Sequence, residues 1–507
     1  MDNQRTKNAT RNMVFGSMLK LYQLVLPFVM RTAIIYFLGM QYLGLNSLFT
    51  SVLQVLNLAE LGVGSAMVYS MYKPIIDGDK DKICALLKLY RIYYRVIGIV
   101  IAVLGVVVIP FLPKLISGTI PSDMNLYILY LLNLSATVMS YWLFAYKNSL
   151  LVAHQRTDVT SKVTLLTNTV QYVLQLAVLF VFKNYYLYLI ISLLSQILTN
   201  IITAIAADRM YPEYRPAGDL DKGEVRTINR RVRDLFTAKF GSVVVNSVDS
   251  IVISAFLGLT ALAIYQNYFY ILTAITGFIT IIFNSVTAGI GNSLVVETLD
   301  KNYNDFKKFT FIIFWILSVA SCCFLCLYQP FMTIWVGSDN LLDDFCVVLF
   351  VIYFIVCELS MVWATYKDAA GMWHEDRFRP LIGASVNLIL NVILVQYIGI
   401  YGILLSTIIS YVLITMPWLI HNLFTRLFKR SARSYLLKLA AYAGACIISC
   451  VCCVLVCNLI TVNNILIVFV KLIICVLIAD AVLILFFRKT NEYKETKALV
   501  MKIIKRG

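Results

Sequence analysis

The chain of 507 residues is 60% hydrophobic and only 14% charged, and its mean hydropathy is +0.81. Soluble domains carry about 25% charged residues, so this composition excludes an ordinary water-soluble globule and predicts an integral membrane protein. The net charge of +16 comes from 43 basic against 27 acidic residues. Because most basic residues flank apolar runs, we interpret this charge as a topology signal and not as a sign of nucleic-acid binding.

About fourteen apolar stretches are long enough to cross a bilayer, and their continuous hydrophobicity predicts helices and not barrel strands. If the N-terminus is cytoplasmic, nearly all lysines and arginines fall on the cytoplasmic side, as the positive-inside bias requires. We therefore expect a multi-pass protein of the cell (inner or plasma) membrane with both termini in the cytoplasm. The stretches are 12–38, 43–72, 84–112, 125–147, 162–182, 185–207, 236–258, 260–290, 309–336, 345–366, 380–398, 400–425, 436–460 and 463–487.

The first stretch carries a polar stripe. Lys20, Gln23 and Arg31 are spaced so that they share one helix face with Pro27. A charge near mid-membrane costs about 2.5–3.5 kcal/mol on insertion scales, so it is expected to face a wet cavity or a partner. These side chains are therefore substrate-binding candidates, although Lys20 alone also fits a side chain that snorkels to the headgroups.

The second half of the chain repeats the first. "FLG" at 37–39 returns at 256–258, and "YKNSLLVAH" at 146–154 returns as "YKDAAGMWH" at 366–374, at nearly one offset. We interpret the Tyr-Lys-His pattern as a structural anchor at a helix end. The repeat places Lys239 and Asn246 on a stripe of the seventh stretch like that of the first, which adds them to the binding candidates.

A duplicated six-helix unit follows from this repeat. Because six is even, both copies cross the membrane in the same sense, which predicts two bundles related by a pseudo-twofold axis along the membrane normal. The expected parts are an N-terminal bundle, a charged cytoplasmic linker, a C-terminal bundle, and two additional helices with a basic tail, at 1–207, 208–235, 236–425 and 426–507.

Three acids lie inside apolar stretches: Glu60, Asp249 and Glu358. Each is a candidate for coupling to a proton or sodium ion. The alternative is a structural ion pair: Asp249 is nearly equivalent to Arg31 in the repeat, and Glu60 adjoins the glycine-rich "ELGVG".

Metal, cofactor and catalytic groups are not expected. The twelve cysteines lie mostly in apolar runs, the chain has only three histidines, and no Walker-type GxxxxGK[ST] sequence is present. We interpret the cysteines as free thiols that fill helix surfaces, and the chain as a transporter and not an enzyme.

Four segments of the sequence are typical of one family: "NLAELGVGSAMV" at 57–68, "YKNSLLVAHQRTDV" at 146–159, "NSVTAGIGNSLV" at 284–295 and the stretch from "YKDAAGMWHEDRFRP" to "STIIS" at 366–410. Through them the whole chain resembles the Wzx-like flippases, which carry oligosaccharide–lipids and belong to the multidrug/oligosaccharidyl-lipid/polysaccharide (MOP) exporter superfamily. The resemblance implies a twelve-helix core in two lobes plus two extra helices, with alternating access to each side. In related flippases of cell-wall precursors, cationic residues of the first helix matter, and Lys20 and Arg31 are the positions here that fit.

The resemblance implies a polyprenyl-pyrophosphate-linked oligosaccharide as cargo, moved from the cytoplasmic to the outer leaflet for surface polysaccharide biosynthesis. Membrane lipid and polysaccharide assembly enzymes are the expected partners. Two alternatives stay open. One is a drug/cation antiporter of the same superfamily, and the other is a membrane sugar polymerase, which would need larger outer loops than this sequence offers.

Overall fold

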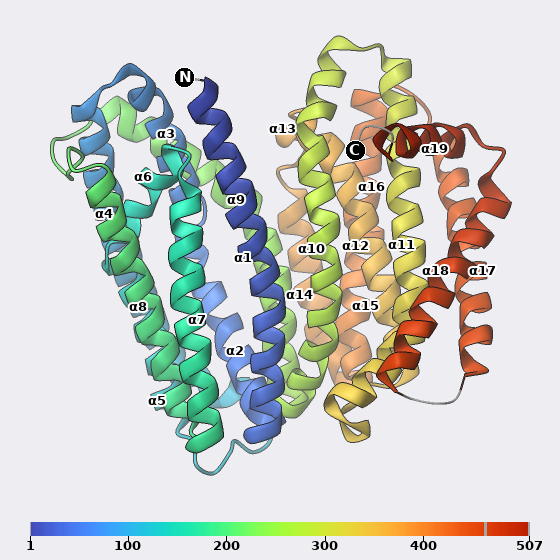
Figure 1. Ribbon diagram of the computed structural model, residues 1–507, viewed down its shortest axis with the longest axis horizontal. Coiled ribbons are helices and arrows are strands. Elements are labelled where there is room, and N and C mark those ends of the chain that lie inside the picture. The colour runs from blue at the N-terminus through green and yellow to red at the C-terminus, as the bar shows by residue number, and fades with distance from the viewer. Residues whose placement is uncertain (1, 461–463, 505–507) are drawn as a thin grey trace. The chain divides into compact units, whose positions relative to one another are not determined.

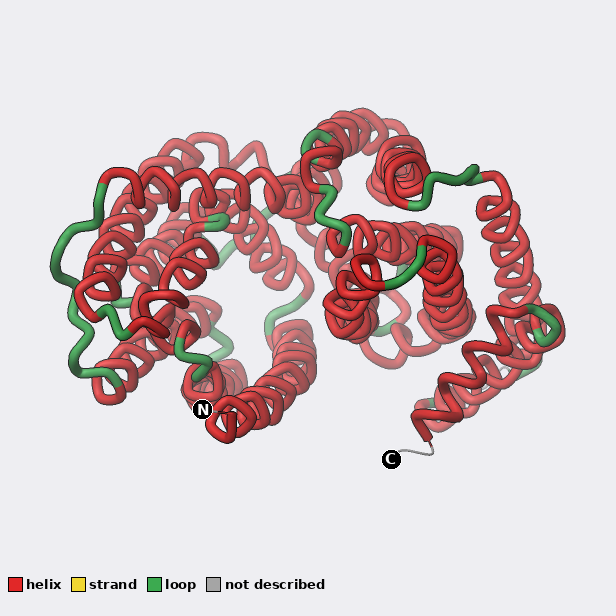
Figure 2. The backbone as a smooth tube through the Cα atoms, turned by 90° about the horizontal axis from the view of Figure 1, so that it is seen from above, coloured by secondary structure: helices red, strands yellow, loops and turns green. Residues whose placement is uncertain are grey.

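The computed structural model describes residues 2–460 and 464–504, and all of their side chains except those of 2–7, 9, 237–239, 242, 244, 246, 503 and 504. These residues form helices joined by short loops, and the described part of the chain contains no β-strand (Figures 1 and 2). The all-α membrane fold expected from the sequence is confirmed. Contacts divide the chain into two compact units, Met1–Ala263 and Ile264–Gly507.

In the first unit α1 packs along α7, α7 packs on α8, and α5 contacts both α4 and α8 (Figure 1). The helices α2 and α3 both contact α9. The helices of this unit are α1 (Asp2–Phe37), α2 (Met40–Leu56), α3 (Val63–Asp77), α4 (Lys80–Val108), α5 (Leu126–Trp142), α6 (Asn148–Ala153), α7 (Thr157–Val181), α8 (Tyr185–Met210) and α9 (Lys222–Leu257), with short 3₁₀ turns η1 (Asn57–Glu60), η2 (Ile109–Leu115) and η3 (Ala145–Lys147).

In the second unit α11 contacts α12, α17, α18 and α19, while α12 and α14 pack on α15. Aromatic side chains fill its core: the hydroxyl of Tyr435 accepts a 2.7 Å hydrogen bond from the indole of Trp363, and the ring centre of Tyr435 lies 5.0 Å from that of Phe306. The elements are α10 (Leu259–Val296), which starts at the end of the first unit, α11 (Leu299–Val336), η4 (Ser338–Asn340), α12 (Asp344–Ala369), α13 (Trp373–Asp376), α14 (Arg379–Ile398), α15 (Ile400–Ser410), η5 (Tyr411–Thr415), α16 (Met416–Asn422), η6 (Leu423–Leu427), α17 (Arg433–Asn458), α18 (Ile465–Phe487) and α19 (Asn491–Ile504).

Twelve helical stretches of the described residues are long and apolar enough to span a membrane, and a bent pair raises the number to thirteen. The bent pair joins Leu126–Trp142 to Ala145–Ala153 at 49°. About fourteen spans were expected. The remaining one, 236–258, lies within α9, where several side chains are outside the described residues.

Two pairs of glycines give the two halves of the chain matching joints. Gly39, between α1 and α2, has φ 111° and ψ 172°, and Gly258, between α9 and α10, has φ 89° and ψ 177°. Gly118, which precedes α5, has φ 84°, and Gly337, which precedes α12, has φ 83°. Residues with a Cβ rarely adopt these positive φ values, so glycine is the residue that each joint requires. The two glycines of each pair are 219 positions apart in the sequence, which supports the duplication inferred from sequence.

The expected linker 208–235 is a loop only up to Asp221, because α9 begins at Lys222. Its first turn is tied to α4 by an ion pair between Glu224 and Lys82. Farther along, α9 lies close to Gly62, where an added Cβ would approach the Cβ of Leu235 to 2.6 Å. Through these contacts α9 groups with the first unit.

Candidate functional site

A polar cavity of about 400 Å³ lies between α2, α5 and α8 of the first unit. It is lined by four side-chain amides and three hydroxyls, together with leucine and alanine side chains. None of its lining groups is charged. The polar lining residues are Thr50, Gln54, Asn57, Asn133, Thr137, Ser192 and Gln196.

Helical spacing brings these groups together. Gln54 lies four residues after Thr50 on α2, Thr137 lies four after Asn133 on α5, and Gln196 lies four after Ser192 on α8. Side chains four residues apart share one helix face. Each helix therefore contributes a short uncharged polar stripe, and the packing of α5 against α2 and α8 makes them one site. These stripes carry no charge and were not among the predicted site residues, although their four-residue spacing is visible in the sequence.

Glu60 is connected to this cavity through one bridging side chain, that of Tyr141. The hydroxyl of Tyr141 lies 3.2 Å from the side-chain oxygen of Asn57, a cavity residue, and 3.4 Å from Oε2 of Glu60. The hydroxyl of Tyr94 donates to Oε1 of Glu60 at 2.8 Å and accepts from Tyr90 at 2.7 Å. The half-buried carboxylate is thus held by tyrosine hydroxyls, and through Tyr141 it is connected to the cavity wall.

The α1 candidates differ in burial. Lys20 and Gln23 are exposed, whereas Arg31 is partly buried and lies within electrostatic range of Tyr188 on α8. Next to this stripe, the hydroxyl groups of Tyr22 and Thr169 form a 2.8 Å hydrogen bond between α1 and α7.

The α9 and α12 candidates lie on separate units. Asp249 is buried in α9, while the side chains of Lys239 and Asn246 lie outside the described residues. Glu358 is buried in α12, and among the described residues its Oε2 atom has no hydrogen-bond partner. The hydroxyl of Thr276 on α10 lies within interaction range of this carboxyl. Burying a carboxylate oxygen that has no hydrogen-bond partner costs free energy, unless the group is protonated or binds a ligand.

A second cavity, about 630 Å³, lies between α3, α4 and α9. Lys82 in its wall is paired with Glu224, and the guanidinium of Arg231 lies 4.6 Å from the ring centre of Tyr69. Its basic and acidic groups are balanced, so it lacks the excess positive charge that a pyrophosphate requires. The charged lining residues are Lys73, Lys82, Arg231, Asp77, Asp79 and Glu224.

The repeated Tyr-Lys-His motifs lead into loops that fold around a buried aspartate. Asp158 accepts from Arg156 at 2.9 Å and lies 3.2 Å from the ammonium of Lys162. In the second copy, Asp376 accepts from Arg379 at 2.5 Å and lies 3.1 Å from the ammonium of Lys367. In both copies two basic groups hold one buried carboxylate at the entry to the next helix.

The two motif histidines have different surroundings. The ring of His154 packs at a tilt against that of Tyr211, with ring centres 4.2 Å apart, and burial lowers the pKa of His154. His374 is exposed. A shared ligand role for the two histidines is therefore not supported, which agrees with the structural interpretation of the motif.

Solved structures share this fold. The structure of "Lipid II flippase MurJ, inward closed conformation" matches with a TM-score of 0.69 at 15% identity, covering 94% of this chain and 99% of that one. Two structures of a multidrug resistance MATE family transporter of the MOP superfamily match at TM-scores of 0.60 (inward-facing) and 0.55 (outward-facing). Their identities are 13% and 14%; each covers 84% of this chain, and the matches cover 99% and 97% of those chains. The fold is thus that of the MOP membrane transporters.

The sequence itself identifies the family. The pattern of the polysaccharide biosynthesis protein family matches residues 9–288, more than half of the chain. The chain belongs to this family. A search among curated proteins found no match.

Proposed function

We propose that this protein is a flippase that moves a polyprenyl-pyrophosphate-linked oligosaccharide from the cytoplasmic to the outer leaflet for surface polysaccharide biosynthesis. The observation that carries the proposal is the uncharged polar cavity between α2, α5 and α8 in a membrane-spanning unit. Membership of the polysaccharide biosynthesis protein family supports it, as does the shared fold with a lipid II flippase. The protein acts as a transporter and not as an enzyme.

The cavity suits a sugar because glycan hydroxyl groups both donate and accept hydrogen bonds. Side-chain amides offer both functions, and here four of them face one space with three hydroxyl groups. Polar groups inside a membrane are costly unless they face water or a ligand. The cavity therefore lets a glycan exchange its hydration for protein contacts while the lipid tail stays in the bilayer.

The pyrophosphate needs positive charge, which this cavity lacks. Arg31 is the described candidate inside the first span, and Lys20 and Lys239 extend the cationic stripes toward the cytoplasmic face. Charge-assisted hydrogen bonds to phosphate are about twice as strong as neutral ones. We assign the headgroup to these residues, and movement across the bilayer to rocking of the two bundles in alternating access.

Reconstitution tests this assignment with two substrates. Liposomes containing the protein should expose a fluorescent polyprenyl-pyrophosphate oligosaccharide to the opposite leaflet. Asn57→Leu should slow transport of the glycan-bearing lipid about fivefold, because one neutral hydrogen bond contributes about 1 kcal/mol. The same change should leave transport of bare polyprenyl pyrophosphate unaltered. Arg31→Ala should slow both substrates, by about tenfold or more.

Gln396→Leu is the matched control. Gln396 is an exposed amide on α14, outside the cavity, so its loss should leave both rates unchanged. The absence of transport for every glycan lipid tested would contradict the flippase. Equal slowing of both lipids by Asn57→Leu would instead remove the glycan role from the cavity.

A drug/cation antiporter is the second candidate. The observation that favours it is the buried Glu358, whose Oε2 atom has no hydrogen-bond partner among the described residues. An antiporter would carry a proton or sodium ion on such a group. Proton-driven dye export from the same liposomes, abolished by Glu358→Gln, would decide for this candidate.

A further inference from the structure

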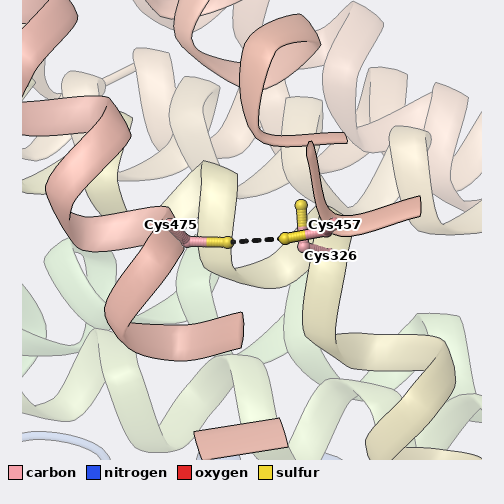
Figure 3. Close-up of side chains that lie close together, drawn as sticks. All are labelled: Cys326, Cys457 and Cys475. Carbon is pink, nitrogen blue, oxygen red and sulfur yellow. Dashed lines mark hydrogen bonds between the residues drawn. The ribbon is translucent and has the colours of Figure 1, made fainter. Parts of the chain in front are cut away.

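Three cysteine side chains from three helices of the second unit meet in its interior (Figure 3). Cys326 comes from α11, Cys457 from α17 and Cys475 from α18. Their sulfur atoms all lie within 4.8 Å of one another, and those of Cys457 and Cys475 are 3.7 Å apart. All three side chains are buried.

Lys471 gives a second, independent observation at this place. It lies one helical turn before Cys475 on α18, and both belong to the buried face of that helix. Only 8% of Lys471 is exposed, and it makes no ion pair among the residues that the structure describes. A buried ammonium without a counter-charge is costly in a membrane, so this position is suited to a nearby negative charge.

We propose that Cys326, Cys457 and Cys475 bind one soft metal ion, for which monovalent copper is the best fit, and that Lys471 balances the charge of the complex. Thiolates prefer soft ions such as Cu⁺. Zinc ordinarily takes four ligands in a structural site, whereas three sulfurs converge here. The site is separate from the transport function proposed above.

The charges and protons balance without an electron transfer. Two of the thiols lose their protons to solvent as two sulfur–copper bonds form. The third sulfur keeps its proton and faces the ion only as a weak, neutral donor. The complex of Cu⁺ with two thiolates carries one negative charge. The ammonium of Lys471 matches it, so the metal-loaded site is close to neutral within the bilayer.

The position of the site gives it a structural consequence. Because α11 packs against both α17 and α18, a single ion bound by all three cysteines would link these helices. A neighbouring thiol pair, Cys322 and Cys450, with sulfur atoms 3.7 Å apart, continues the same interface between α11 and α17. A bound ion is thus expected to stabilise this part of the second unit.

Copper binding tests the proposal directly. The full chain, purified in detergent and kept reduced without oxygen, is titrated with Cu⁺ in competition with the chromogenic chelator bicinchoninate. We expect one equivalent to be retained. Cys457→Ser and Cys475→Ser should each weaken binding at least about 100-fold, and Lys471→Met should weaken it about tenfold, since partners outside the ligand set contribute 10–100-fold. Cys84→Ser, in the first unit, should change nothing.

X-ray absorption on the copper-loaded wild-type protein identifies the atoms bound to copper, so the proposal can be tested even if a variant fails to fold. It should show copper surrounded by sulfur alone. Nitrogen or oxygen ligands, retention of copper unchanged in the two serine variants, or no retention against bicinchoninate would each overturn the proposal. Tighter retention of Zn²⁺ than of Cu⁺ would overturn the choice of ion.

Discussion

Tyr401, the second residue of α15, donates a 2.5 Å hydrogen bond to Asp343, the residue that caps the N-terminus of α12. The first unit contains a counterpart. There the hydroxyl of Tyr186, the second residue of α8, accepts a 2.7 Å hydrogen bond from the backbone N–H of Asn125, which caps α5. Each half of the chain therefore ties its sixth span to the cap of its fourth with a tyrosine. With the matched glycine joints, this contact supports descent of both halves from one ancestral unit.

The glycine joints predict a stability difference. Gly337→Ala should destabilise the protein by about 1–2 kcal/mol, because φ is +83° there while an added Cβ would meet no atom within 4 Å. The cost is therefore that of the backbone conformation alone. Gly289→Ala, inside α10 and equally uncrowded, should be neutral or stabilising by up to about 1 kcal/mol. Thermal unfolding of both variants in detergent measures the contrast, and equal effects would refute the argument.

Replacing Asp158, the buried aspartate after the first Tyr-Lys-His motif, is expected to reduce stability strongly. Asp158→Asn should lower the free energy of unfolding by about 2 kcal/mol or more. Asp158 is fully buried, and the substitution would leave Arg156 and Lys162 without their counter-charge. Asp219→Asn is the matched control. Asp219 is 86% exposed in its pair with Lys88, so its loss should cost less than about 1 kcal/mol. Denaturant titration compares the two, and a similar loss in both would contradict the structural role of the motif.

The docking of α19 should depend on pH. Burial acts to raise the pKa of Glu492, but the hydrogen bond from Lys438 on α17, a backbone hydrogen bond and the charges of Lys438 and Lys307 together hold the pKa below its usual value. A carboxyl with a lowered folded-state pKa adds stability above its unfolded pKa, and this stability is lost as pH falls through the folded value. We therefore expect α19 to stay docked at neutral pH and to loosen in acid, as the pH falls through the lowered pKa of Glu492.

Trp315 reports on this transition, because its ring stacks on Tyr493 of α19 at 5.8 Å. In a variant that keeps only this tryptophan, fluorescence should change as pH falls. Glu492→Gln should remove that change and give the loosened signal already at neutral pH. A pH response that survives Glu492→Gln would assign it to another group.

Tyr141 links the cavity to Glu60, so Tyr141→Phe should slow glycan–lipid transport about fivefold, the effect of about 1 kcal/mol in positioning Asn57. Tyr130→Phe is the control on the same helix. The hydroxyl of Tyr130 is also buried but bonds the backbone oxygen of Gly105, away from the cavity. The Tyr130→Phe variant should therefore lose about as much stability as Tyr141→Phe but keep the wild-type transport rate. Equal transport rates in the two variants would separate Tyr141 from the cavity function.

Sequence determined much of the fold because hydrophobic length and glycine joints are local properties. The expected span 345–366 corresponds to α12, Asp344–Ala369, and the expected span 185–207 to α8, Tyr185–Met210. The interruption at η1, followed by Gly62 with φ +90°, falls inside the expected span 43–72, although Asn57, Glu60 and the glycines of "ELGVG" mark the place in the sequence. Hydropathy does not distinguish a straight span from a broken one.

The site was harder to predict because it depends on which helix faces meet. The charged residues of the apolar spans predicted a site at Arg31 and Lys20 on α1, whereas the cavity is lined by amides such as Asn57 of η1, Asn133 of α5 and Gln196 of α8. Each short stripe is unremarkable within its own span. Only the packing of α2, α5 and α8 makes them a site.

The bent fourth span of the first unit differs from its counterpart, since α12 runs unbroken from Asp344 to Ala369. The second span differs in the same way: it is interrupted at η1 in the first unit, while α10 is continuous from Leu259 to Val296. A broken helix releases backbone N–H and C=O groups, which a membrane tolerates only beside protein or water. The two halves thus differ in helix continuity at their second and fourth spans, and the half in which these two spans are interrupted is also the one that contains the polar cavity.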